Sequence, residues 1–178
     1  MPEIEATPFG NFRYELVFTE NLLKSSGGKP GEKRDLAGGA FAECTGFEAT
    51  MEPKVIKEGG ANYGAHQRVG TVSFATIILR RGMTLNRDLW QWFHQVTFGG
   101  AFTHRMDLEI RHLDLDGKTV IRTWKLHRAL PVKFKSADLN AKGAEIAVEE
   151  LHLVHEGLQL AAPASAKPSP APAAAPAS

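Results

Sequence analysis

The sequence has little that would indicate a disulfide-bonded or a nucleic-acid-binding protein. Its 178 residues include one cysteine, Cys44, so no internal disulfide can form and folding in a reducing compartment is favoured. The neighbours Ala42 and Gly46 are small, which predicts a quiet, buried thiol rather than a nucleophile. Lys and Arg number 21 against 20 Asp and Glu, and this balance predicts no general attraction to nucleic acid or to an acidic membrane.

Long apolar runs are also missing. No stretch of about 18 apolar residues occurs, so we expect no membrane-spanning helix and no insertion into a membrane by the protein itself. The first residues, MPEIEATPFGNF, lack a basic segment followed by an apolar one, so they do not resemble a secretory signal. Export would therefore need another route.

Phosphate, calcium and nucleophile motifs are incomplete. Gly117-Lys118-Thr119 resembles the end of a P-loop, but His112 stands where the first glycine is required. Asp114 and Asp116 begin like a calcium loop, whose downstream ligands are missing. No Gly-x-Ser-x-Gly nucleophile motif occurs.

The histidines and carboxylates form no recognisable catalytic or metal pattern. His152 and His155 are three apart, so on a strand they would point to opposite faces, and structural zinc spacings are absent. We interpret the carboxylates Glu149, Glu150 and Glu156 as solvent-exposed or as facing another subunit. Arg80-Arg81 is interpreted as a salt-bridged edge rather than a phosphate site. The sequence thus predicts no enzyme, no cofactor and no metal. The side chains considered were the pairs His104/His112 and His152/His155 and the carboxylates Glu149, Glu150 and Glu156.

What the chain does contain is alternating apolar and polar residues, which is typical of strands with one buried face. This pattern covers residues 12–18, 40–52, 106–111 and 118–127, and shorter strands are expected at 132–135 and 146–154. Asp116-Gly117 predicts a hairpin between the segments 106–111 and 118–127. Pro53 breaks the second segment, so Lys54–Glu58 is expected to return beside it and complete a hairpin over residues 40–58. In the last expected strand the alternation of apolar and polar residues is interrupted at Glu149-Glu150, which predicts a bulge.

The most apolar stretch is Thr71–Gly100, which reads as strand, turn and helix. Val72–Leu79 is rich in β-branched residues, as expected of a well-buried strand. Thr84 is the expected helix N-cap, and Gly99-Gly100 should end the helix. Trp90 lies off the buried stripe and is left open as either core or subunit contact. The stripe itself is predicted to contain Leu85, Leu89, Trp92, Phe93 and Val96.

The organisation predicted from these elements is one domain over residues 1–160 and a disordered tail over 161–178, which is almost entirely Ala, Pro and Ser. Two long loops, 24–38 and 58–68, interrupt the domain. The fold class is mainly β (α+β): two packed antiparallel sheets forming a barrel or sandwich of about eight strands, with one short α-helix covering a gap.

Several segments occur in the same order as in a known family. The chain resembles the tail tube (inner tube) proteins of contractile phage tails and of phage-tail-like contractile injection systems, over about residues 9 to 160. The segments are AFAECTGFE at 40–48, KEGGAN at 57–62, LRRGMT at 79–84, LWQWF at 89–93, WKL at 124–126, ALPVKF at 129–134, EIAVEEL at 145–151 and HEGL at 155–158.

This resemblance implies a structural, non-enzymatic subunit. Six copies would form a ring, and rings would stack into a rigid hollow tube that sheath contraction drives through a target envelope. The implied partners are further copies, a sheath protein, baseplate or hub and tube-terminating proteins, and a protein effector or DNA as cargo. Assembly would take place in the bacterial cytoplasm, as part of a particle that can be released.

The resemblance also assigns roles to residues. Two hairpins per subunit, expected at 40–58 and 106–127, would join those of five neighbours into one barrel around the lumen. Lumen-facing candidates are Glu48, Thr50, Glu52, Asp107, Glu109, Arg111, Thr123 and Lys125. Candidates for contacts between subunits or rings are Glu58, Gly59, Gly60, Asn62, Tyr63, Arg80, Arg81, Met83 and Trp90.

Alternatives remain open at this point. Within the same fold they are a haemolysin-coregulated (type VI secretion) tube protein and a baseplate-proximal tube initiator. From another class, a monomeric ligand-binding β-barrel would have a mostly apolar interior, which the polar hairpin faces disfavour.

Overall fold

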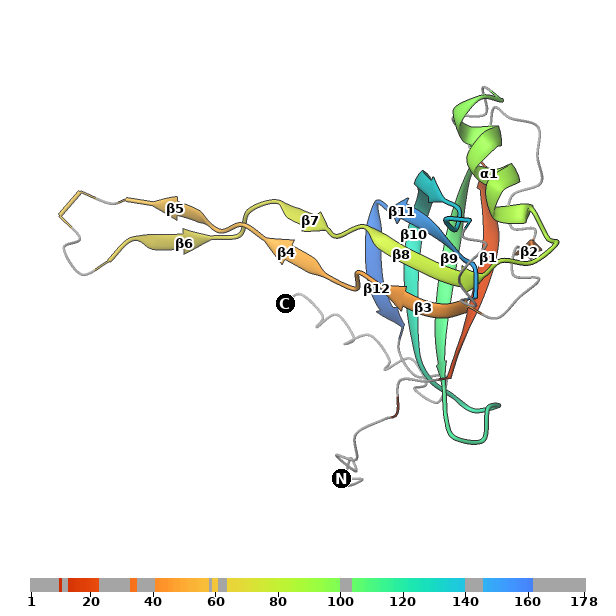
Figure 1. The fold of residues 1–178 in the computed structure, drawn as a ribbon. Coiled ribbons are helices and arrows are strands. Elements are labelled where there is room, and N and C mark those ends of the chain that lie inside the picture. The colour runs from red at the N-terminus through yellow and green to blue at the C-terminus, as the bar shows by residue number, and fades with distance from the viewer. Residues whose placement is uncertain are drawn as a thin grey trace, which may run out of the picture.

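The protein is a two-layered β-structure with one helix and a long two-stranded arm (Figure 1). The computed structural model describes residues 10, 13–22, 33–34, 41–57, 59–60, 64–99, 104–139 and 146–161. Most of the expected loop 24–38 and residues 162–178 of the expected tail lie outside these ranges. Ala161, which we assigned to the tail, is the last residue of a strand.

Two antiparallel sheets form the body, and they share one long strand, β10 (Val120–Lys135). The first sheet has the order β2 (Lys33–Arg34), β1 (Tyr14–Leu22), β9 (His104–Leu113), β10, β12 (Gly157–Ala161). The second has the order β10, β11 (Val148–Val154), β8 (Ile77–Gly82), β3 (Phe41–Thr45). This confirms the predicted fold class. Among the described residues no pairing joins β2 to β3, so the body is a sandwich and not a closed barrel.

A sharp bend in β10 lets it serve both sheets. Arg128 has a φ of 53°, and the register shifts between Leu126 and Ala129 and again after Pro131. A positive φ is unfavourable for a residue with a Cβ and therefore needs support from its surroundings. The Arg128 N–H donates to Asp107 Oδ1 at 2.8 Å, and its Nε donates to Glu156 Oε2 at 2.7 Å.

The core lies between the sheets and contains every second side chain along each strand. The predicted burial of Leu16 and Phe18 on β1 and of Met106, Leu108 and Ile110 on β9 is confirmed. The turn at Asp116-Gly117 closes the predicted β9–β10 hairpin, with Gly117 at a φ of 69°. The second sheet contributes Ile77, Leu79, Leu151 and Leu153.

Helix α1 (Asp88–Thr97) covers one end of the sandwich and buries Leu89, Trp92 and Val96. The Trp92 Nε1–H donates to the carbonyl of His104 at 3.3 Å, so the core role expected for Trp92 holds. The helix starts later than predicted: its N-cap is Arg87, which makes no side-chain cap hydrogen bond, and Thr84 Oγ1 accepts the Asn86 N–H at 3.2 Å before the helix begins. No helix in the described part of the chain is long and apolar enough to cross a membrane.

Leu85 was wrongly assigned to the buried stripe: it precedes the helix and its side chain is fully exposed, whereas Leu89 is buried. Leu89→Ala is therefore expected to lower the free energy of unfolding by about 2–5 kcal/mol, because it leaves a cavity under the helix. Leu85→Ala should change it by less than about 0.5 kcal/mol. Urea unfolding of both variants checks this, and equal losses would contradict the helix start described here.

The arm consists of two short ladders in series. Strand β4 (Ala49–Met51) pairs with β7 (Val72–Phe74), and β5 (Lys54–Ile56) pairs with β6 (His66–Arg68). The arm leaves the body between β3 and β8 and projects far from it (Figure 1).

The expected hairpin over residues 40–58 is therefore wrong. Pro53 interrupts the ladder between β4 and β5 without reversing the chain, because it lacks an N–H but fits an exposed ribbon. At this point the Glu52 N–H donates to Thr71, and a Cβ on Gly70 would lie 1.7 Å from the Glu52 oxygen. The single strand expected over Val72–Leu79 is also divided, into β7 on the arm and β8 in the body. Its first residue, Val72, is exposed on the arm.

Candidate assembly surfaces

Five of the eight lumen candidates lie together on the outer face of the first sheet. The register places Lys125 opposite Glu109 and Thr123 opposite Arg111, and Asp107 shares their parity. We call this set, with Glu15 of β1, the charged face. Its members are Glu15, Asp107, Glu109, Arg111, Thr123 and Lys125.

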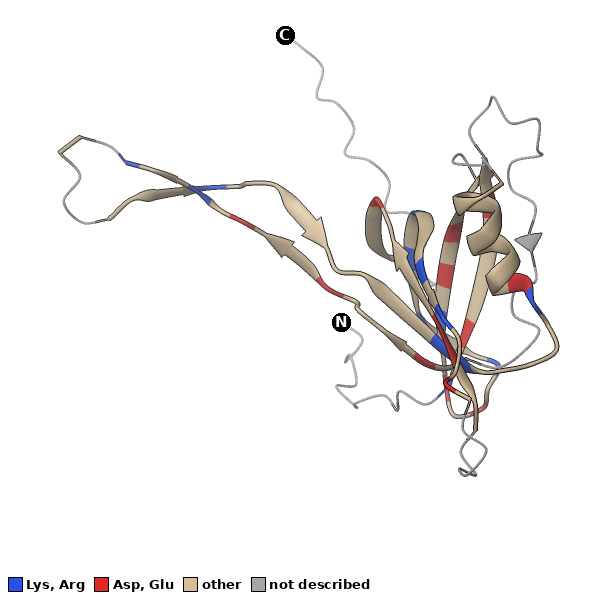
Figure 2. Cartoon of the chain, turned by 45° about the horizontal axis from the view of Figure 1, so that its top comes forward, with Lys and Arg blue, Asp and Glu red and all other residues tan. Residues whose placement is uncertain are grey.

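Ion pairs cross the charged face from strand to strand. Glu109 accepts from Lys125 Nζ at 2.9 Å and from Arg111 Nη2 at 2.9 Å, and Arg111 Nη1 lies 3.6 Å from Glu15. Figure 2 shows both acidic and basic bands on the strands of the body. The hydrogen bond from Lys125 lowers the pKa of the Glu109 carboxyl, against an opposing effect of burial and with a further contribution from Arg111. The face is polar, and Glu15, Glu109, Arg111 and Lys125 are ion-paired within the subunit, while Asp107 accepts hydrogen bonds from Asn21 and the Arg128 N–H.

Glu109→Gln is expected to destabilise the protein by less than about 1 kcal/mol at neutral pH, because the pairs are partly solvated. A folded-state pKa below the ordinary value of 4.5 means that the pairing stabilises the protein above that pH. The stabilisation disappears as the pH falls through the lowered pKa. Urea unfolding at a series of pH values should show the difference from the unmodified protein vanishing in acid.

Glu52→Gln is the matched control for this experiment, because Glu52 is an exposed carboxylate on the arm. Its effect should stay below about 0.5 kcal/mol. A deficit of Glu109→Gln that is constant across the pH range would contradict the assignment.

The other three lumen candidates, Glu48, Thr50 and Glu52, are not on the charged face. They lie on or beside β4 at the base of the arm, and all three are exposed. Thr50 Oγ1 donates to Glu48 Oε1 at 3.3 Å, so these two side chains share one side of the ribbon. The prediction grouped them with β9 and β10 because it assumed a hairpin within residues 40–58.

Of the expected subunit contacts of the second loop, the two described residues lie at the tip of the arm. Gly59 and Gly60 form a turn there, with Gly60 at a φ of 91°, and Glu58, Asn62 and Tyr63 lie outside the described residues. Sequence reasoning missed the apolar side chains that the arm exposes. A glycine-rich stretch flanked by two β-branched segments was the available signal. These exposed side chains are Phe47, Met51, Val55, Ile56, Val69 and Val72.

Arg80 and Arg81 have different roles. Arg80 is half exposed and bridges Glu43 at 2.7 Å and Glu150 at 3.1 Å, so the expected salt bridging is present. These two carboxylates raise the pKa of its guanidinium, the hydrogen bond to Glu43 being the largest cause. The expected edge position is wrong, because β8 lies between β11 and β3. The prediction that Arg81 contacts another subunit or ring is wrong. Its side chain is 1% exposed and paired with Glu149, so it belongs to the interior of the subunit.

The predicted bulge at Glu149-Glu150 is also wrong. Strand β11 pairs with β8 without a register shift, and Glu149 takes the inward parity of a core residue. The apparent slip arises because the inward residue is a carboxylate, paired with Arg81. The irregularity lies instead in the partner strand β10, after Pro131.

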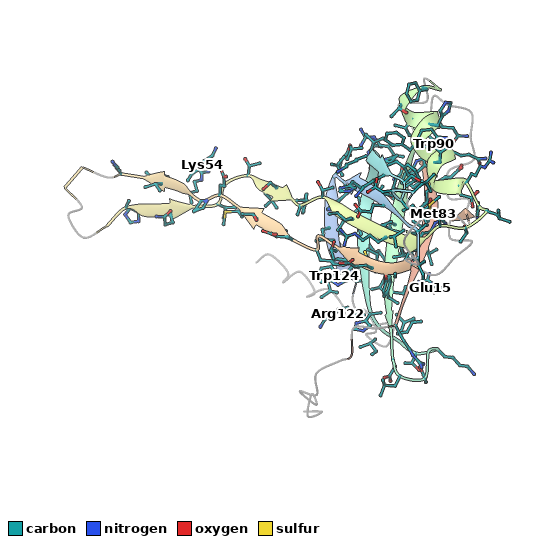
Figure 3. The ribbon with its side chains drawn as sticks, in the orientation of Figure 1. Glu15, Lys54, Met83, Trp90, Arg122 and Trp124 are labelled. Carbon is teal, nitrogen blue, oxygen red and sulfur yellow. The ribbon has the colours of Figure 1, made fainter. Side chains whose placement is uncertain are left out.

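Trp90 and Met83 are exposed at the helix end of the body, far from Lys54 on the arm (Figure 3). The Trp90 ring packs edge-on against Phe134 at 5.3 Å between centroids and beside Phe93 at 5.9 Å. It remains 43% exposed, so the aromatic cluster presents part of its surface to solvent. Both residues stay candidates for contacts outside the subunit.

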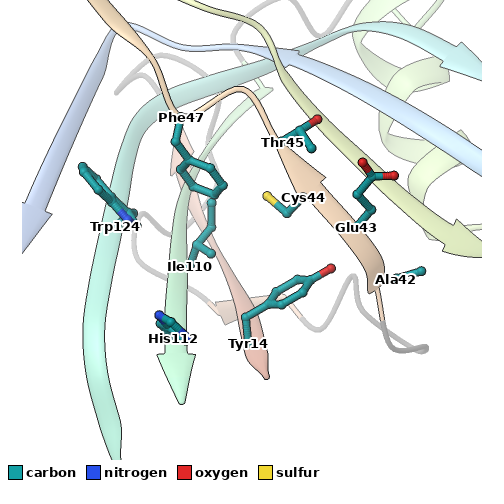
Figure 4. Close-up of a pocket in the computed structure, with 9 residues that line it drawn as sticks. All are labelled: Tyr14, Ala42, Glu43, Cys44, Thr45, Phe47, Ile110, His112 and Trp124. Carbon is teal, nitrogen blue, oxygen red and sulfur yellow. The ribbon is translucent and has the colours of Figure 1, made fainter. Parts of the chain in front are cut away.

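A pocket of about 580 Å³ opens between the two sheets near the root of the arm (Figure 4). Tyr14 of β1 closes one side by donating its hydroxyl hydrogen to the Phe41 carbonyl of β3 at 2.9 Å. Burial, together with the charge of Glu43, raises the pKa of the Cys44 thiol to about 12, in agreement with the expected quiet thiol. The lining residues are Tyr14, Ala42, Glu43, Cys44, Thr45, Phe47, Ile110, His112 and Trp124.

The histidines that were considered as metal ligands are spread through the fold. His104 and His112 lie near opposite ends of β9, His152 lies 3.5 Å from Glu150, and His155 packs on Phe74. In the part of the chain that the structure describes, no group of three or more His, Cys, Asp or Glu side chains is arranged to hold a metal ion.

Comparison with known proteins identifies one family. The model of the T4-like virus tail tube protein gp19 family matches residues 11–159. No curated protein sequence matches the chain.

Solved structures share the fold at low sequence identity. A chain of the six-fold symmetrised baseplate of the anti-feeding prophage is 22% identical, with a TM-score of 0.71, and the match covers 88% of this chain and 97% of that chain. In an extracellular contractile injection system, PVC, a chain of the extended sheath–tube complex is 19% identical, with a TM-score of 0.68 and coverages of 89% and 94%. A chain of the PVC sheath/tube terminator is 19% identical, with a TM-score of 0.69 and coverages of 90% and 100%.

Proposed function

Since the chain belongs to the T4-like virus tail tube protein family, we propose that it is the structural inner-tube subunit of a contractile injection system or phage tail, without catalytic activity. Six copies form a ring, and rings stack into a rigid hollow tube that is driven through a target envelope when a sheath contracts. The subunit contributes stiffness and a passage.

The observation that carries this proposal is the arm. A two-stranded ribbon is marginally stable alone, and this one exposes Val55 and Ile56 at 54% and 46%. Exposed apolar side chains gathered on one projection mark a surface for protein contact. In a ring or stack of rings the arm would lie against neighbouring copies, which would stabilise it. This accounts for an element that would be a liability in a monomer.

The charged face supports a lumen. A water-filled passage needs a polar wall, and the β9–β10 hairpin presents Asp107, Glu109, Arg111, Thr123 and Lys125 on one side. Because Lys125 and Arg111 pair with Glu109, and Arg111 also with Glu15, the wall would not grip a cargo of either charge. Glu48, Thr50 and Glu52 would line the lumen only where the arm joins it.

The proposed partners follow from the assemblies of similar fold. The six-fold symmetrised anti-feeding prophage baseplate and the PVC sheath–tube and terminator complexes support a hexamer that contacts a sheath, baseplate or hub and tube-terminating proteins. The tube would assemble in the bacterial cytoplasm, within a particle that can be released, and a protein effector or DNA would pass through it. Gly59, Gly60, Arg80, Met83 and Trp90 remain the proposed contact residues among those described, together with Glu58, Asn62 and Tyr63, which lie outside the described residues.

The test is assembly of the purified protein. Size-exclusion chromatography with light scattering should give a mass six times that of the chain or larger, and electron microscopy should show hollow tubes with six-fold end views. Adding a sheath protein encoded beside it should decorate these tubes. A stable monomer that binds a small apolar molecule would instead support the ligand-binding β-barrel.

A further inference from the structure

The outer part of the arm has one face that combines basic and apolar side chains. The register places Lys54 opposite Arg68 and Ile56 opposite His66, so these four side chains share one face. Among the described residues of this part, 54–57, 59–60 and 64–68, every Lys, Arg, Asp or Glu is basic, and the full segment 54–68 adds one acid, Glu58. Like charges directly opposite each other on a ribbon are destabilising. The face therefore favours a partner surface with an apolar centre and an acidic rim.

The pocket between the sheets has this chemistry. Phe47, Ile110 and Trp124 form apolar walls, and its volume of about 580 Å³ exceeds that of an aliphatic side chain. Glu43 lies at the rim, where its side chain is 46% exposed. Its partner Arg80 is shared with Glu150, so the guanidinium compensates the Glu43 charge only in part.

The arm cannot fill the pocket of its own subunit. Phe47 lines the pocket at the root of the arm, and the ribbon runs outward from there to Lys54 and beyond (Figures 1 and 3). The partner of the basic face must therefore belong to another molecule, and a second copy provides the pocket.

We propose that the inter-sheet pocket receives Ile56 from the arm of a second copy, with Lys54 and Arg68 of that copy against Glu43. The proposal rests on the assembly described under the proposed function and names the surface on which the arm docks. Ile56 provides the apolar contact. The repulsion between Lys54 and Arg68 is reduced because both lie beside the Glu43 carboxylate.

The single native cysteine makes the docking measurable. Cys44 lines the pocket, so Ile56→Cys should form a disulfide between copies when assembled protein is oxidised with copper phenanthroline at mildly alkaline pH. A catalyst is needed because the raised pKa of Cys44 keeps the thiolate scarce. Non-reducing electrophoresis should show most of the protein in covalent oligomers. These end at hexamers if the contact lies within a ring and extend further if it joins rings.

Val55→Cys is the matched control, because Val55 is the adjacent residue, is similarly exposed and points to the opposite face of the ribbon. It should give at most one tenth of the crosslinked product of Ile56→Cys. Combining Ile56→Cys with Cys44→Ala should abolish the product and so exclude bonds between two arms.

Two outcomes overturn the proposal and are distinguished by microscopy. Normal tubes of Ile56→Cys without crosslinks would place Ile56 elsewhere while leaving the tube function intact. Absence of both tubes and crosslinks in Ile56→Cys and in the unmodified protein would overturn the proposed function as well.

Discussion

A variant that lacks residues 60–64 is expected to purify as a folded, soluble protein that forms no tubes. No core residue lies on the arm between Met51 and Val72, so removing its tip deletes nothing that holds the two sheets together. The deletion leaves β5 and β6 joined by a four-residue connection, which a hairpin accommodates. The free energy of unfolding should change by less than about 0.5 kcal/mol, as for other surface changes. Negative-stain microscopy measures the loss of tubes, and thermal unfolding measures the preserved body.

A variant with Gly60–Gly64 replaced by five serines is the control for the deletion, because it keeps the length of the arm. If this variant forms some tubes and the deletion forms none, the length of the arm matters more for assembly than the identity of the residues at its tip. Tubes of normal length and diameter from the deletion would contradict the role of the arm and, with it, the proposed assembly.

Arg81→Ala is expected to lower the free energy of unfolding by about 3–5 kcal/mol, because it leaves the Glu149 carboxylate buried without its partner. Arg81 also donates to the Asn86 carbonyl at 3.3 Å, and its guanidinium lies 5.9 Å from the centre of the Phe41 ring. For a chain of this length, a loss of this size should lower the melting temperature by roughly 6–20 °C. Urea unfolding and calorimetry measure both quantities.

The neighbouring arginine provides the control. Arg80→Ala removes an exposed pair of bridges and should cost at most about 1 kcal/mol. The double variant Arg81→Met, Glu149→Leu removes both buried charges and should recover most of the stability lost in Arg81→Ala, because an apolar pair of similar volume can replace a buried ion pair. Equal losses for Arg80→Ala and Arg81→Ala, or no recovery in the double variant, would show that the buried pair is not the cause.

Elements with one buried face could be predicted from the sequence, and the arm could not. On β1 and β9 the alternation of Leu16, Phe18, Met106 and Leu108 with polar residues reports directly which side chains meet the core. The arm alternates in the same way, yet it has no core to face, because both of its sides are exposed in the subunit. Periodicity identifies a strand but not the strand with which it pairs. For this reason the sequence wrongly predicted that residues 40–58 form a hairpin among themselves.

Arg81 and Glu149 were misread for a related reason. A pattern argument treats charged residues as solvent-facing, although a matched pair opposite each other in β8 and β11 can occupy inward positions. Of the candidate contacts, Arg80 was expected to form salt bridges, but its long-range partners Glu43 and Glu150 became visible only in the fold. The inter-sheet pocket had no sequence signal, because β1, β3, β9 and β10 all contribute to its walls.

The bend at Arg128 has a mechanical consequence. Since β10 continues from one sheet into the other, an axial load applied to either layer reaches the second through covalent backbone as well as through side-chain packing. Two carboxylates stabilise the bend: Asp107 accepts the Arg128 main-chain N–H, and Glu156 accepts the Arg128 side-chain Nε–H. A column of such subunits would therefore transmit thrust without the layers shearing past each other, and its weakest planes would be the contacts between molecules.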